Sequence, residues 1–126
     1  MSIIVNRRDL DFVMYEALDL NTILESEHYA DYDRESLDAM LDLCQSLAED
    51  QFLPFAAKLD ANEPKFVDGK VETIPEVKEA INAYREAGLC TSAYDADIGG
   101  MQLPWMMDQA LTGMFVCANN PVHTYL

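Results

Sequence analysis

Residues 33–59 read DRESLDAMLDLCQSLAEDQFLPFAAKL and form the clearest periodic stretch of the sequence. Apolar residues recur there at steps of three and four, as they do along one face of an α-helix, and acidic residues decorate the other face. Asp33 is a favourable N-cap, so we expect a helix that starts at Asp33 or Ser36 and runs to about Leu59. Pro54 removes one backbone hydrogen bond, which predicts a kink. The expected buried stripe is Leu37, Met40, Leu41, Cys44, Leu47, Ala48, Phe55 and Leu59.

Shorter helical patterns lie on both sides of this stretch. Residues 9–18 have apolar side chains at helical spacing, and residues 26–33 form a polar and aromatic connection. After the long helix, an Asp68-Gly69 turn could close a small hairpin between short apolar runs. Pro75 is typical of a first helical residue, and Gly88 of a helix end.

The last third of the chain starts with an aperiodic loop over residues 92–103. Pro104 then opens another helix, and Asn119-Asn120-Pro121 interrupts it. Its expected stripe is Met107, Ala110, Leu111, Met114, Phe115 and Ala118. The sequence therefore predicts an all-α fold, an up-and-down, bundle-like arrangement of about five helices.

Composition limits the class of protein. The chain has 126 residues, half of them hydrophobic, which suits one small domain with a packed core. Its 23 acidic and 8 basic residues give a net charge of −15, so nucleic acids and anionic membranes are poor partners. No run of 18 apolar residues exists, which predicts no membrane span, and the N-terminus does not resemble a signal peptide.

The three cysteines indicate a reducing compartment. Their odd number and wide spacing favour free thiols in the cytoplasm rather than a disulfide framework. Cys44 and Cys117 lie on the apolar stripes, so we expect both in the core.

No constellation in this sequence predicts catalysis or metal binding. The acidic run that begins at Asp31 has Ser36 in place of the glycine of a calcium loop, and its twelfth position, Asp42, lies inside the expected long helix. His28 and His123 have no cysteine or carboxylate at zinc-ligand spacing. Gly99-Gly100 lacks the remaining glycines of a phosphate-binding loop. We therefore assign no catalytic and no metal-binding residue.

The order of features nevertheless resembles the N-terminal helical domain of acyl-CoA dehydrogenases, and most closely the long bacterial subfamily. The resemblance spans residues 9–126. It rests on the entry segment DLDFVMYE at residues 9–16, the helix end Ala87-Gly88-Leu89, and the loop DIGGMQLP at residues 97–104. The family signature has Gly-Gly-x-Gly-Leu-Pro in this loop, and Gln102 replaces its third glycine.

The resemblance implies part of a flavoenzyme that removes two hydrogens across the α–β bond of an acyl-CoA, as in fatty-acid β-oxidation. Residues 1–32 would be an N-terminal extension with short helices, and residues 33–126 the N-terminal helical domain. The catalytic Glu, the FAD-binding β-domain and the C-terminal helical domain would lie outside this chain. The chain is thus expected to be a fragment that binds no FAD and has no activity alone.

The resemblance also implies two surfaces. In the intact enzyme, Val122, His123 and Thr124 would line the cleft for the acyl chain of the substrate. Met101, Leu103 and Leu111 would surround a hydrophobic dock for electron-transferring flavoprotein. The intact enzyme is expected to be a homo-oligomer.

Composition alone also fits a different class, an acidic helical protein-interaction module without enzymatic activity. Such a module would have a polar C-terminus, whereas this sequence stops at apolar residues just inside a new helix. The loop at residues 97–104 also favours the enzyme.

Overall fold

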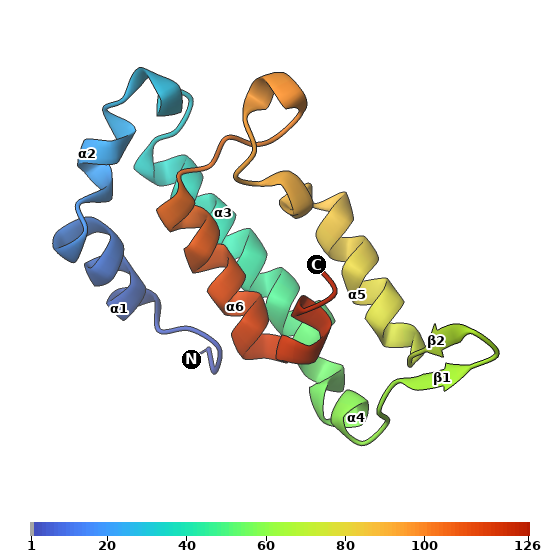
Figure 1. The fold of residues 1–126 in the computed structure, drawn as a ribbon. Coiled ribbons are helices and arrows are strands. Elements are labelled where there is room, and N and C mark those ends of the chain that lie inside the picture. The colour runs from blue at the N-terminus through green and yellow to red at the C-terminus, as the bar shows by residue number, and fades with distance from the viewer. Residues whose placement is uncertain (1) are drawn as a thin grey trace.

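A computed structural model describes residues 2–126, and helices dominate it (Figure 1). The first third contains α1 (Arg7–Asp11), a π-helical turn (Phe12–Ala17) and α2 (Leu20–Leu24). α3 (Arg34–Leu47) continues through a π-helical turn (Ala48–Phe52) and a 3-10 turn (Leu53–Phe55) into α4 (Ala56–Asp60). A hairpin of β1 (Lys65–Val67) and β2 (Lys70–Glu72) precedes α5 (Pro75–Glu86) and α6 (Trp105–His123). The predicted all-α class is confirmed.

Local sequence sets the ends of these helices. Asp33 caps α3 in a capping box, because its carboxylate accepts the Ser36 N–H at 2.8 Å while the Ser36 hydroxyl accepts the Asp33 N–H at 3.0 Å. The α-helical hydrogen-bond pattern ends at Leu47, seven residues before Pro54. The π-helical turn and the 3-10 turn that follow accommodate the proline. Pro75 opens α5 as predicted, and Gly88 follows its end with a left-handed φ of 76°.

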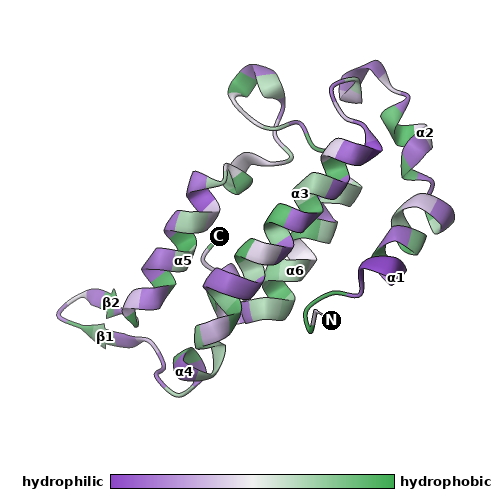
Figure 2. Cartoon of the chain, turned by 180° about the vertical axis from the view of Figure 1, so that it is seen from behind, coloured by the Kyte–Doolittle hydropathy of each residue, from purple (hydrophilic) through white to green (hydrophobic). Residues whose placement is uncertain are grey.

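α3 and α6 lie side by side at the centre, and α5 runs in the opposite direction on one side of them (Figure 1). The first helices cover the other side. Hydrophobic residues gather on α6 and on the faces that meet it, while the outer faces are hydrophilic (Figure 2). The aromatic centre is Phe115, whose ring centroid lies 4.9 Å from those of both Phe52 and Tyr84, in edge-on geometry.

The predicted hairpin is present, and it stands outside the core. Phe66 pairs with Val71, and both side chains are exposed. Asp68 and Gly69 form the turn with positive φ angles of 49° and 80°, the conformation that an Asp-Gly turn favours.

One expectation about the last helix needs correction. Cys44 is buried as predicted, but Cys117 is exposed. Each helical residue turns the chain by about 100°, which moves Cys117 off the buried line defined by Phe115 and Ala118. The residues expected on the stripe of this helix do pack inward, since Met107, Leu111, Met114, Phe115 and Ala118 are buried and Ala110 is partly buried.

Candidate functional site

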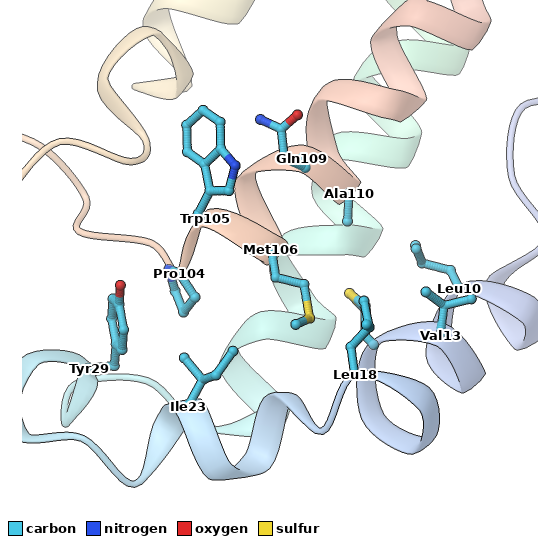
Figure 3. A pocket seen from close by; sticks show the side chains of 11 residues that line it. Leu10, Val13, Leu18, Ile23, Tyr29, Pro104, Trp105, Met106, Gln109 and Ala110 are labelled. Atoms are coloured by element: carbon cyan, nitrogen blue, oxygen red, sulfur yellow. The ribbon is translucent and has the colours of Figure 1, made fainter.

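An apolar groove of about 650 Å³ lies between the first helices and the start of α6 (Figure 3). The first helices contribute apolar side chains to one wall, and the first turns of α6 form the other. Only two polar side chains, Tyr29 and Gln109, reach the lining. The remaining lining residues are Leu10, Val13, Met14, Leu18, Ile23, Pro104, Trp105, Met106 and Ala110.

Only some of the apolar side chains on the wall formed by the first helices are buried in the core. Met14 is buried, whereas Val13 is 44% and Leu18 55% exposed. On the opposite wall Trp105 is 67% exposed. The sequence predicted a helix here from these same apolar residues, and the structure shows that part of their surface remains open to solvent.

Polar contacts fasten the first helices to α3 beside the groove. Arg7 pairs with Asp42 of α3 at 2.5 Å. Arg34 of α3 lies 3.7 Å from Asp11 and stacks on the ring of Tyr15, 4.0 Å from its centroid. Burial is the main cause that raises the pKa of Tyr15 above its ordinary value. These contacts fix the position of the wall that carries Val13 and Leu18.

The loop at residues 92–103 is closed by its own backbone. The Gly100 N–H donates to the Asp95 carbonyl at 3.0 Å, and the Gln102 N–H to the Tyr94 carbonyl at 2.8 Å. A Cβ on Gly100 would lie 2.0 Å from the Tyr94 carbonyl oxygen, so only glycine fits there.

Two side chains tie this loop to the first third of the chain. The Gln102 amide Nε2 donates to the His28 carbonyl at 2.5 Å, and the Tyr32 hydroxyl donates to the Met101 carbonyl. From the sequence, Gln102 is only a departure from the family signature. Its contact with the His28 carbonyl was not predicted.

The expected docking residues lie at different depths. Leu103 and Leu111 are buried, and Met101 is partly buried against the same core. None of the three lines the apolar groove.

The expected cleft residues follow a break in α6. Asn119 has non-helical angles (φ −163°, ψ 81°), and its buried side-chain amide donates to the Phe52 carbonyl at 3.0 Å. The turn after Pro121 buries Val122 completely, leaves His123 half-buried and exposes Thr124. Burial lowers the pKa of His123 below its ordinary value, so its imidazole is neutral at pH 7.

A reactive cysteine, a metal site and a membrane-spanning helix are the other features that could indicate a function in the described part of the chain. Burial raises the pKa of Cys44 to about 12, so this thiol is no nucleophile at neutral pH. Residues 2–126 contain no group of three or more His, Cys, Asp or Glu side chains that could hold a metal ion. Over the same residues, no helix is both long and apolar enough to cross a membrane.

The groove does not fit FAD. A flavin dinucleotide carries an anionic pyrophosphate that needs cationic side chains or a cradle of backbone N–H groups. The groove instead has an apolar lining, and residues 9–33 on its one side contain eight acidic residues and no Lys or Arg.

Comparison with known proteins identifies the family. The chain is 37% identical over 105 residues to a butyryl-CoA dehydrogenase of Syntrophomonas wolfei subsp. wolfei, a match that covers 78% of this chain and 17% of that protein. It is 32% identical over 123 residues to the broad-specificity linear acyl-CoA dehydrogenase FadE5 of Mycobacterium tuberculosis, which covers 95% of this chain and 20% of that protein. No family model matches the sequence.

The chain thus belongs to the acyl-CoA dehydrogenase family. It spans about a fifth of the length of the curated relatives it matches.

Proposed function

We propose that the chain is the N-terminal helical domain of an FAD-dependent acyl-CoA dehydrogenase of the fatty-acid β-oxidation type. The main support for this proposal is the loop at residues 97–104. The sequence of this loop resembles the family signature, and Gly100 occupies a position where a Cβ would clash with the backbone. Residues 1–32 would be its N-terminal extension and residues 33–126 the domain proper, and the intact enzyme would act in the cytoplasm as a homo-oligomer.

In this proposal the domain closes one side of the acyl-chain cleft. FAD, held by other domains, would supply the acceptor for the hydride. The residues of this chain would exclude water from the acyl chain and limit its length. The relatives support an acyl-CoA substrate, since their names specify butyryl-CoA and linear acyl-CoA.

His123 would be the cleft residue that limits chain length, between Val122 and Thr124. It is half-buried, and its pKa is lowered by that burial, so a neutral imidazole can lie beside methylene groups. An imidazole next to an apolar chain still needs a hydrogen-bond partner, which favours a short or polar-tailed acyl group.

We further propose that electron-transferring flavoprotein docks over Met101. The partly buried Met101 would form the contact surface, and the buried Leu103 and Leu111 would form its floor. Replacement of Met101 by Asp in the intact enzyme should then slow electron transfer to the protein acceptor and spare transfer to a small dye.

The test of the cleft is the chain-length profile of kcat/KM for His123→Ala in the intact enzyme. Each methylene that becomes buried contributes about 0.8 kcal/mol, or about fourfold in kcat/KM. The optimum should therefore move toward longer acyl chains, whereas an unchanged profile would remove His123 from the cleft. The 126-residue chain alone should show neither flavin absorbance nor acyl-CoA-dependent dye reduction.

A further inference from the structure

We propose that the apolar groove beside α6 is a docking site for an amphipathic helix of a partner protein, with apolar residues on one face and Lys or Arg on its flanks. The groove shares no lining residue with the proposed acyl cleft or with the surface at Met101. This inference therefore stands independently of the proposed function.

The spacing of the apolar residues suits a helical partner. One wall of the groove carries Leu10, Val13, Met14 and Leu18, along the end of α1 and the π-helical turn that follows it, which is about two helical turns. A docked helix presents apolar anchors at positions i, i+3 or i+4, and i+7, which also span about two turns.

The open wall disfavours a small molecule. Small-molecule pockets bury most of the surface of their ligand, but Leu18 and Trp105 are each more than half exposed in this groove. Exposed aromatic and aliphatic side chains around a depression are typical of protein interfaces. Trp105, one of the residue types most frequent among binding hot spots, would be the principal contact.

The charge of the two segments that form the groove indicates a cationic partner. Residues 9–33 hold eight acidic side chains and no Lys or Arg, and residues 104–126 of the opposite wall hold Asp108 and no Lys or Arg. The nearest arginines are already engaged, because Arg7 pairs with Asp42 and Arg34 with Asp11 and Asp38. Arg8 is the exposed cation at the start of this wall.

This excess of acidic charge favours a cationic partner over two other occupants. A second copy of the chain, with its net charge of −15, would bring acid against acid. An anionic membrane surface would be repelled in the same way. Lys or Arg on the flanks of a docked helix would instead be attracted by the excess acidic charge of residues 9–33.

The 126-residue chain carries its own reporter for this test. Trp105 is the single tryptophan of the sequence and lies on the groove. The probe is a tryptophan-free synthetic helix with Leu at i, i+3 and i+7 and Lys on the flanking positions. The control peptide has the same Leu positions and Glu on the flanks.

The Lys-flanked helix should shift the emission of Trp105 to shorter wavelength in a saturable way, and its affinity should fall as salt is added. The Glu-flanked helix should bind about tenfold more weakly or not at all. Leu18→Glu should weaken binding of the Lys-flanked helix by at least about tenfold, since it places a charge on the apolar wall. Leu43→Glu is the matched control, because Leu43 is 58% exposed on α3 and Leu18 is 55% exposed.

Several outcomes would overturn the proposal. One is an emission shift with neither peptide, or equal binding of both. Another is equal loss of binding in Leu18→Glu and Leu43→Glu. If Trp105 already emits at short wavelength without a peptide, and sedimentation shows a dimer, a second copy occupies the groove. The same emission in a monomer would mean that another part of the same polypeptide covers it.

Discussion

Gln102 shows how a single residue departs from a family pattern and is still accommodated. Its φ of 56° lies in the left-handed region, where a residue with a Cβ is disfavoured by about 1–2 kcal/mol. Its side chain offsets this cost with two hydrogen bonds: Oε1 accepts the Ala96 N–H at 3.0 Å, and Nε2 donates to the His28 carbonyl. The glycine of the family signature would need no such compensation.

Two substitutions of Gln102 separate the backbone cost from the side-chain bonds. Gln102→Ala loses both hydrogen bonds and keeps the strained φ, whereas Gln102→Gly loses the same bonds and relieves the strain. The Gly variant should therefore be more stable than the Ala variant by about 1 kcal/mol, measured by urea unfolding. Equal stabilities would show that φ at this position costs nothing.

Gly100 and Gly113 predict opposite effects of the same substitution. Gly100→Ala would place a Cβ against the Tyr94 carbonyl and should destabilise the protein by several kcal/mol. Gly113 lies inside α6, and no atom outside the neighbouring backbone of the helix would come within 4 Å of a Cβ there, so Gly113→Ala should stabilise by about 0.5–1 kcal/mol. Thermal unfolding of the two variants checks both signs, and destabilisation by Gly113→Ala would contradict the helical argument.

At the scale of elements, local chemistry predicted where helices begin and end. Asp33, Pro75 and Gly88 carry their own signals, and each lies where the pattern placed it. The π-helical turns at Phe12–Ala17 and Ala48–Phe52 were not predicted. Their residues have ordinary helical propensity, and tertiary packing around buried Met14 and Phe52 sets their geometry.

The cap of α3 makes its stability depend on pH. The Ser36 backbone N–H holds the pKa of Asp33 below its ordinary value of 3.8. The unfolded chain therefore binds the proton more readily, and the contribution of Asp33 is complete above pH 3.8 and lost as pH falls through the folded pKa. Asp33→Asn keeps an acceptor without a titrating group, so its unfolding midpoint should fall less between pH 5 and about pH 3 than that of the unmodified protein. An identical acid dependence in both proteins would mean that other carboxylates dominate.

At the scale of the whole molecule, sequence periodicity identifies which residues are apolar but not which ones the core leaves open. The apolar residues of 10–18 predicted a helix with a buried face, and the groove arises because this face meets residues 105–110, about ninety positions later in the chain. The relative placement depends on the pairs Arg7–Asp42 and Arg34–Asp11 and on the contact of Gln102 with His28. No local pattern encodes such long-range contacts, so the groove could not be predicted from the sequence.

The net charge of −15 predicts how the 126-residue chain responds to salt. Like charges repel more strongly in the compact state than in the unfolded chain, so screening should stabilise the fold. The Debye length falls from about 30 Å at 0.01 M salt to about 8 Å at 0.15 M, which spans the dimensions of a domain of this size. The midpoint of thermal unfolding should therefore rise by several degrees over this range of sodium chloride.

Exposed ion pairs such as Lys58–Glu76 act in the opposite direction, since salt weakens them, but surface pairs contribute only about 0–1 kcal/mol each. A variant with fewer exposed acids, Glu16→Gln with Asp50→Asn, supplies the control. It should begin with a higher midpoint at 0.01 M salt and gain less from added salt, because less repulsion remains to be screened. A midpoint that falls with salt in the unmodified protein would show that the ion pairs outweigh the net charge.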